Sequence, residues 1–171
     1  RANRCKRLQT VSAYGYDEVA KQTYFGLRLH VVIAWPGVIH DLELLPANVH
    51  DTEAAALMLD KKTGFVLADR NYWKPVLQEQ LAEHNLHLLA PYKSAKREKT
   101  PYPLLLKHKR YRLETIFGQL VHRFKAKAVW ARDEWHLCSR WLRLILAHSF
   151  TVLLCQLNGL SPLRFSELVN V

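Results

Sequence analysis

The chain has 171 residues, of which 49% are hydrophobic and 23% charged, a composition that argues against a disordered segment. Its three cysteines are scattered and include no CxxC pair, which argues against a zinc site and favours a reducing cytoplasm. The net charge is +10, and residues 93–132 hold 12 of the 25 Lys and Arg but only two of the 15 acids. Such a concentrated positive segment indicates a polyanionic partner such as nucleic acid, with a solvated basic surface as the alternative.

Neither a signal peptide nor a membrane span is expected. The N-terminal residues contain no long apolar stretch. The longest apolar run, residues 144–157, is interrupted by His148 and Gln156 and is shorter than the roughly 20 residues that span a bilayer. We therefore expect a soluble cytoplasmic protein with no membrane contact. Because the first residue is Arg1 and not Met, we also expect a fragment of a longer protein.

The first third of the chain predicts a β-hairpin. Residues 1–20 are polar, and the Tyr-Gly-Tyr-Asp stretch at 14–17 is predicted to be a turn. Residues 23–35 are rich in β-branched and aromatic side chains and predict a strand. Pro36-Gly37 predicts a tight turn, and the alternating residues 38–45 predict a second strand.

Helices and short strands alternate in the remainder of the chain. Asp51 is expected to cap a helix over 52–60, and Pro75 to open a helix that ends near residue 84. Short buried strands are expected over 65–68 and 86–89, followed by a basic linker over 92–103. Two long helices are expected over roughly 105–128 and 134–157.

The element order is therefore β-β-α-β-α-β-α-α. A hairpin followed by β-α-β units predicts an α/β fold with a mixed sheet flanked by helices. With one more strand before residue 1, this would be the order of the ribonuclease-H-like fold, so the first strand is expected to be missing. We expect a single domain over residues 1–171, of which 134–171 is the C-terminal helical part.

Two carboxylates are candidates for catalysis. Asp69 follows directly after a predicted strand, where ligand-binding groups of α/β sheets gather. Glu114 is the only acid of the long helix over 105–128 and borders its apolar stripe. It is predicted to be either an ion-pair partner of Arg110, four residues earlier, or a metal ligand. Together with a third carboxylate, the two could bind Mg²⁺ for phosphoryl transfer.

Four sequence blocks, in this order and at compatible spacing, strongly resemble the core of bacterial insertion-sequence transposases of the DDE type: YFGLRLH (24–30), PANVHD (46–51), LADRNY (67–72) and RYRLETIF (110–117). The resemblance implies that Asp69 is the second acid and Glu114 the third, that Arg110 belongs to the signature around the Glu, and that the cofactor is Mg²⁺ or Mn²⁺. It implies cleavage and strand transfer of double-stranded DNA at element ends and target. The first acid of the family lies before the segment that resembles residues 1–6, so we expect this chain alone to be impaired.

The expected DNA contacts are the cations in and around the basic segment. Val121 stands where some relatives have a lysine, for which Arg123 or Lys125 are candidate substitutes. The residues expected to bind DNA phosphates are Lys93, Lys96, Arg97, Lys107, Lys109, Arg112, Arg123, Lys125 and Lys127.

Several alternatives remain open. The chain could be a non-catalytic DNA-binding remnant whose acids are idle. It could also be a related nuclease or hydrolase with a metal at His40-Asp41 or His50-Asp51, although adjacent strand residues point to opposite faces. Trp130, Trp135 and Trp141 are expected to pack between helices, with base stacking as the alternative. The helix over 134–157 is expected to cover the sheet, and its apolar width leaves a homodimer open.

Overall fold

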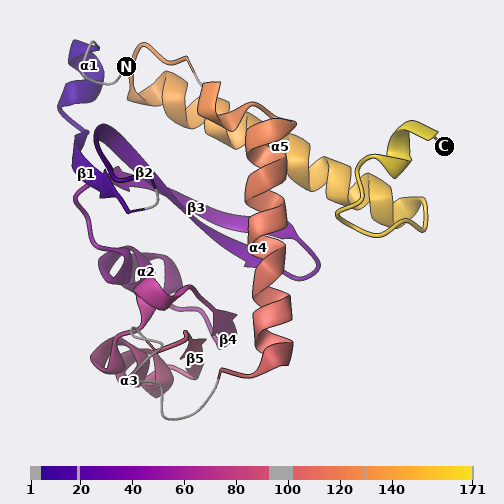
Figure 1. The fold of residues 1–171 in the computed structure, drawn as a ribbon, viewed down its shortest axis with the longest axis horizontal. Helices are drawn as coiled ribbons and strands as arrows, with labels where there is room; N and C mark the ends of the chain where they lie inside the picture. Colours follow the sequence, from indigo (N-terminus) through magenta and orange to yellow (C-terminus); the bar gives the residue numbers. More distant parts are fainter. Residues whose placement is uncertain (1–4, 19, 93–101, 129, 171) are drawn as a thin grey trace. The chain divides into compact units, whose positions relative to one another are not determined.

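The computed structural model of the chain describes residues 5–18, 20–92, 102–128 and 130–170. They form two compact units. Figure 1 shows the ribbon coloured by residue number, so that the segments of each unit can be followed. The first unit combines residues 1–48 with residues 113–171, and the second consists of residues 49–112. Helix α4 (Leu104–His122) contributes residues to both units.

A three-stranded antiparallel sheet is the frame of the first unit. Strands β2 (Gln22–Ala34) and β3 (Val38–Pro46) pair along most of their length, which confirms the predicted hairpin. Gly37 N donates to Ala34 O at 2.8 Å in the turn between them. Gly37 has a φ of 148°, which side-chain-bearing residues rarely adopt, so the glycine is required there.

The predicted turn at residues 14–17 is wrong, because these residues belong to strand β1 (Ala13–Asp17). β1 pairs antiparallel with the first part of β2. The Tyr14 and Phe25 rings meet edge to face at 4.9 Å, which adds an aromatic cross-strand contact to the ladder. The chain instead reverses after Asp17, where Lys21 has a positive φ of 53°. A short helix, α1 (Lys6–Gln9), precedes this strand.

The long helix predicted over 105–128 ends earlier than expected. Helix α4 stops at His122, and Lys125 has a φ of 55°, which breaks the helical path. A 3₁₀ turn, η4 (Ala126–Ala128), follows. Ala126 is buried with Ile39 and Ile116, so packing of this alanine into the core accompanies the early end of the helix.

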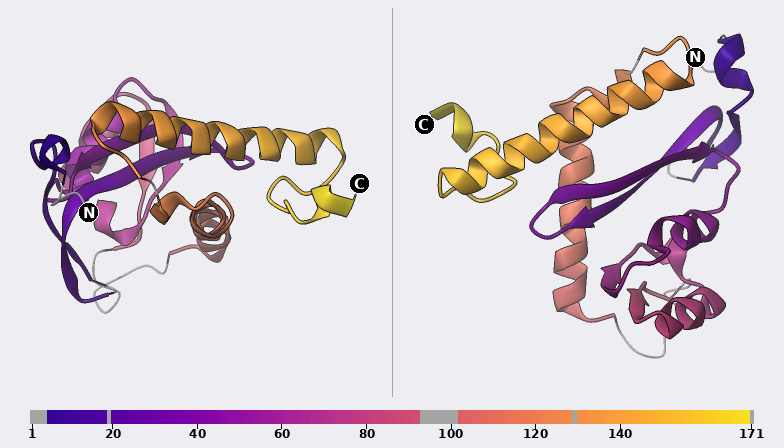
Figure 2. Two further views of the ribbon diagram at one scale, coloured as in Figure 1. Left: turned by 90° about the horizontal axis from the view of Figure 1, so that it is seen from above. Right: turned by 180° about the vertical axis from the view of Figure 1, so that it is seen from behind.

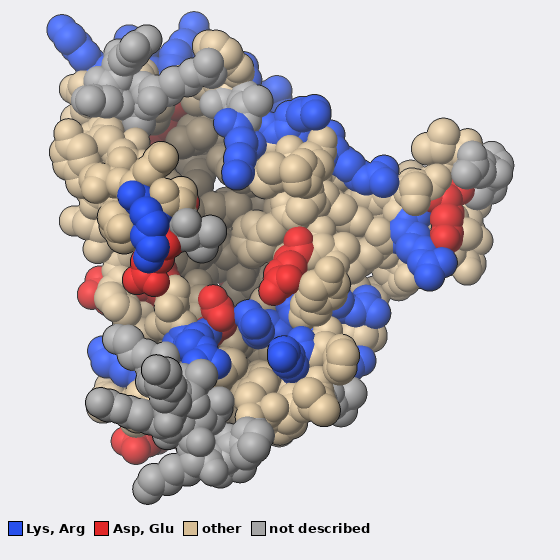
Figure 3. Space-filling model, in the orientation of Figure 1, with Lys and Arg blue, Asp and Glu red and all other residues tan. Residues whose placement is uncertain are grey.

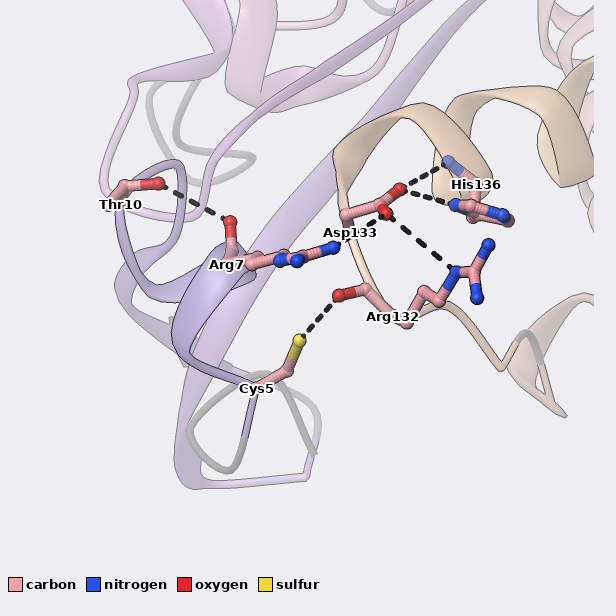
Figure 4. A network of polar contacts seen from close by, with 6 residues as sticks. All are labelled: Cys5, Arg7, Thr10, Arg132, Asp133 and His136. Carbon is pink, nitrogen blue, oxygen red and sulfur yellow. Dashed lines mark hydrogen bonds and ion pairs between the residues drawn. The ribbon is translucent and has the colours of Figure 1, made fainter.

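Helix α5 (Glu134–Leu157) has the predicted bounds and packs against β3 (Figure 2). Asp133 is its N-cap and accepts hydrogen bonds from both the backbone N–H and Nδ1 of His136. These hydrogen bonds lower the pKa of the Asp133 carboxyl. The N-terminal segment contacts the start of α5 through two polar interactions. Arg7 Nη1 lies 3.7 Å from Asp133 Oδ2, and Cys5 Sγ donates to Arg132 O at 2.9 Å (Figure 4).

A buried histidine lies between α4 and α5. His148 has no exposed surface, and its Nε2 donates to Gln119 Oε1 at 3.0 Å, since that amide oxygen can only accept. Gln119 Nε2 in turn donates to Leu163 O at 2.6 Å and so ties the C-terminal segment to α4. Burial lowers the pKa of His148 from 6.5 to about 4, and the ring also contacts Phe124 and Phe165.

The second unit contains the predicted β-α-β segment. Strands β4 (Gly64–Leu67) and β5 (Leu86–Leu89) pair in parallel and are connected through helix α3 (Pro75–Glu83), which packs on β5. Helix α2 (Asp51–Leu59) precedes them and buries Ala54, Ala55, Met58 and Leu59.

The predicted cap of α2 is wrong. The helix begins at Asp51, and the preceding His50 is its N-cap, because His50 Nδ1 accepts a hydrogen bond from Thr52 N at 3.3 Å. An imidazole nitrogen thus replaces the carboxylate oxygen expected at this position. His50 is therefore the N-cap of α2, and Asp51 is the first residue of the helix.

The fold class is mixed α/β, as predicted. The expected single mixed sheet is not observed among the described residues, where an antiparallel sheet β1-β2-β3 lies in the first unit and a parallel sheet β4-β5 in the second. Strand β1 gives three antiparallel strands, after which α2, β4, α3 and β5 follow in the chain. The strand that was expected to be missing from this element order is therefore present, as β1.

In the part of the chain that the structure describes, α5 is the one helix that is long and apolar enough to cross a membrane. The sequence prediction considered only residues 144–157, whereas the helix has 24 residues. This is weak support for a membrane span, because length and composition do not distinguish it from a core helix of a soluble protein.

Candidate active site

Asp69 lies just beyond the carboxyl end of β4. The buried Ala68 continues the strand pairing through a hydrogen bond from its N–H to Leu89 O, and Asp69 then opens the 3₁₀ turn η2 (Arg70–Tyr72). As N-cap of this turn, Asp69 accepts a hydrogen bond from Arg70 N at 2.7 Å through Oδ1. Its side chain remains 55% exposed, so the carboxylate is both fixed by the backbone and open to solvent.

Arg110 holds the same carboxylate oxygen from helix α4. Its Nη1 lies 3.0 Å from Asp69 Oδ1, and the guanidinium is 27% exposed. Since the Asp69 side chain is more than half exposed, this ion pair stabilises the fold by at most about 1 kcal/mol. Its main effect is orientation, because both bonds fall on Oδ1 and leave Oδ2 without a hydrogen bond from any described residue.

Aromatic contacts at the ends of the parallel strands support this arrangement. Tyr102 Oη donates to Leu89 O at 3.3 Å, so the start of α4 is tied to the end of β5. Burial raises the pKa of the Tyr102 phenol, while the Arg110 charge opposes that shift. The Trp73 and Tyr92 rings meet at 4.3 Å and connect the segments that follow β4 and β5. These aromatic residues were not predicted from the sequence, because no spacing rule links them.

Glu114 lies in α4, one helical turn after Arg110, and its side chain is exposed. The buried residues of this part of α4, Ile116 and Leu120, come two and six positions after Glu114 and so lie on the other side of the helix. The prediction that Glu114 borders the core-facing stripe is therefore not confirmed. The ion pair between Glu114 and Arg110, one of the two predicted alternatives, is not the contact observed, because Arg110 donates to Asp69. Asp69 and Glu114 belong to different units, so their joint binding of a metal stays a prediction.

Within residues 5–18, 20–92, 102–128 and 130–170, no three His, Cys, Asp or Glu side chains gather closely enough to hold a metal ion. The donor chemistry of Asp69 nevertheless fits a hard cation, since one exposed carboxylate oxygen has no partner among the described residues.

Comparison with known proteins decides the family. Residues 1–129 match the profile of the transposase DDE domain. The chain belongs to this family. No curated protein and no solved structure matches it. The match to the transposase DDE domain includes Asp69, Arg110 and Glu114, and it ends before α5.

The cations that are expected to bind DNA differ in their exposure and in the side of α4 on which they lie. Lys107 and Lys109 are exposed on α4, and Arg112 is half-buried there. Seven-residue spacing puts Lys107 on the same side of α4 as Glu114, with Arg110 between them in sequence, whereas Lys109 and Arg112 lie on another side. Figure 3 shows lysine and arginine side chains (blue) at the molecular surface.

Three further predicted cations come after helix α4. Arg123, Lys125 and Lys127 are exposed but follow the end of α4, so they lie on a turn and not on the helix extension that the sequence predicted. Lys93, Lys96 and Arg97 lie outside the described residues.

The three tryptophans near the start of α5 differ in burial. Trp141 packs against the core cluster of Ile39, Ile116 and Ile145, as expected. Trp130 and Trp135 are 60% and 71% exposed, so the prediction that they pack between helices is wrong for these two.

Proposed function

We propose that this chain is part of the catalytic core of a DNA transposase that cleaves strands at insertion-sequence ends and transfers them to target DNA. Membership of the transposase DDE domain family supports this function. The observation that carries the proposal is the Asp69 carboxylate, which follows β4, is 55% exposed and is held through Oδ1 alone. The substrate is double-stranded DNA, and the site of action is the cytoplasm.

The proposed fold is the ribonuclease-H-like class, with both compact units as parts of one catalytic domain. Its support is the element order, since three antiparallel strands precede two parallel strands that are separated by helices. Strand β1 is the antiparallel strand that the sequence alone did not predict.

Asp69 and Glu114 are the proposed ligands of Mg²⁺ or Mn²⁺. Carboxylate oxygens are the ligands that such hard cations prefer. When bound, the ion would supply charge neutralisation for phosphoryl transfer. Arg110 fixes Oδ1 of Asp69 and thereby leaves Oδ2 for the cation. Lys107, on the side of α4 that carries Glu114, would bind a DNA phosphate.

These 171 residues contain two of the three acids that the resemblance implies. We therefore expect them, as an isolated chain, to bind metal weakly and to cleave DNA slowly or not at all. The alternative is a non-catalytic DNA-binding transposase remnant. The basic segment over 93–132 favours it, because its positive charge would bind DNA whether or not the acids act.

Metal binding and DNA nicking by the purified chain distinguish these readings. Mn²⁺ affinity is measured by electron paramagnetic resonance, nicking with a supercoiled plasmid, and DNA binding by gel shift. Asp69→Asn and Glu114→Gln should each weaken Mn²⁺ binding at least about tenfold and leave DNA binding intact. Asp60→Asn, an exposed acid after α2, is the matched control.

Each outcome has a defined meaning. Unchanged Mn²⁺ binding in both variants would refute the assignment of the two ligands. Nicking by the wild-type chain that disappears in Asp69→Asn would support the enzyme and refute the expected impairment. DNA binding without specific Mn²⁺ binding would favour the non-catalytic remnant.

A further inference from the structure

Helix α5 carries a second apolar face that no described residue covers. Its exposed members recur at helical spacing and therefore lie on one side of the helix. They are 46–73% exposed and together form what we call the α5 stripe: Trp135, Leu142, Leu146, Phe150, Leu153 and Leu157. The other side of α5 is packed in the first unit through Ile145, His148, Val152 and Cys155, which are buried. Only one of the two apolar faces of α5 is thus used within the described fold.

The size of the stripe matches a protein interface. At about 200 Å² for a fully exposed large apolar residue, the exposed part of these six residues amounts to about 700 Å². Monomeric proteins rarely expose an apolar patch above roughly 600 Å². A specific interface buries about 800 Å² on each partner. A second copy of the same stripe would supply the matching area.

The charges of α5 determine how two copies would pair. Glu134, Arg140 and Arg143 lie in its first ten residues, and residues 144–157 contain no Asp, Glu, Lys or Arg. A parallel pair would place the arginines of the two copies beside each other. An antiparallel pair places Arg140 and Arg143 of each copy beside the carboxyl end of the other helix, where the helix dipole gives a partial negative charge. The antiparallel arrangement therefore combines apolar burial with favourable electrostatics.

We propose that two copies of this chain associate through the α5 stripe as an antiparallel, two-fold symmetric helix pair. Phe150 then lies near the two-fold axis, Leu146 opposite Leu153 of the second copy, and Leu142 opposite Leu157. This assembly does not depend on the proposed catalytic role. A bilayer is the less suitable occupant, because the buried side of α5 holds a polar His148–Gln119 pair and packs on β3.

The mass of the chain in solution tests the association. Sedimentation velocity over about 1–100 µM should show the wild-type chain as a dimer. The double variant Leu146→Glu with Leu153→Glu puts charge in the centre of the stripe and should weaken dimerisation at least about 100-fold. Both positions are exposed, so far-ultraviolet circular dichroism should show a fold like that of the wild type.

The matched control adds the same charge elsewhere. Gln80→Glu with Ser166→Glu changes two exposed residues outside α5 and should remain dimeric. A wild-type chain that is monomeric over the whole range would overturn the proposal. So would a dimer whose mass is unaffected by the Leu146 and Leu153 changes, and so would flotation with neutral lipid vesicles of a chain that is monomeric in their absence.

Cysteine cross-linking tests the orientation. In a background with Cys5→Ser and Cys138→Ser, where Cys155 is buried, Leu142→Cys and Leu157→Cys are prepared as separate chains. Oxidation of their mixture should give a disulfide between the two different chains, and neither chain alone should form one. Self-cross-linking of each chain would indicate a parallel pair and overturn the proposed arrangement. A dimer of intact mass without any cross-link would overturn it as well.

Discussion

Replacement of His148 by glutamine should remove a pH dependence of stability that the wild-type chain shows below neutral pH. His148 is fully buried against Phe124 and Phe165, and burial lowers its pKa from 6.5 to about 4. The folded state therefore holds the neutral ring, while the unfolded chain takes up a proton as the pH falls below 6.5. Because the unfolded state binds more protons in this range, stability is fully present above pH 6.5 and is lost as the pH falls towards 4.

The size of the effect follows from the shift. One pKa unit corresponds to about 1.4 kcal/mol, so the full shift amounts to about 3 kcal/mol at acidic pH. About 2 kcal/mol of this should be lost between pH 7 and pH 5. Glutamine at position 148 has no titrating group and can still donate to Gln119 Oε1, so its variant should lack this component.

Urea unfolding at pH 7, 6 and 5 measures how much the free energy of unfolding falls with pH, with tryptophan fluorescence as the readout. Four of the five tryptophans, Trp35, Trp130, Trp135 and Trp141, lie in the first unit and report on the surroundings of His148. Other groups also titrate, so the relevant quantity is the difference between wild type and variant at each pH. His40→Gln, at an exposed position of β3, is the control. Parallel stability curves for wild type and His148→Gln between pH 7 and 5 would refute the reasoning.

Three further substitutions test local features. Gly118→Ala should stabilise α4 by about 0.5–1 kcal/mol, because an added Cβ meets no atom within 4 Å, and the midpoint of thermal unfolding should rise by about 1–4 °C. An unchanged or lower midpoint would contradict this. His50→Ala should lower the free energy of unfolding in urea by about 1 kcal/mol, because α2 loses its cap, whereas His50→Asn should retain most of the stability. Equal losses in the two variants would show that the cap contributes nothing. The double variant Lys107→Gln with Lys109→Gln should bind duplex DNA with a weaker salt dependence: the slope of the log binding constant against log salt concentration should fall in magnitude by about two. Lys61→Gln is the control, and an unchanged slope in the double variant would place these lysines away from the phosphates.

Local chemistry explains why much of the fold was predictable. The hairpin of β2 and β3 follows from alternating apolar residues around Pro36-Gly37, and α5 follows from an apolar repeat that begins after Asp133. The parallel strands β4 and β5 follow from short apolar runs separated by a helix that starts at Pro75.

Interactions distant in sequence explain the errors. Tyr14–Asp17 has the composition of a turn, and only its pairing with β2 makes it a strand. The bounds of α4 depend on the burial of Ala126 in a core formed by several elements, which helix propensity does not register. The error in the cap of α2 is local instead: two adjacent polar residues could cap the helix, and the hydrogen bond from Thr52 N to His50 Nδ1 shows that His50 does.

By itself, the sequence determined the mixed α/β class, the transposase resemblance and the candidate acids Asp69 and Glu114, because each rests on residue types at fixed spacing. Tertiary structure decided that Arg110 donates to Asp69, since a contact across 41 residues has no signature in local periodicity. It also decided that His148 is buried and that the α5 stripe is exposed. An apolar repeat indicates which side chains avoid water, but only the packed chain determines which of them are covered.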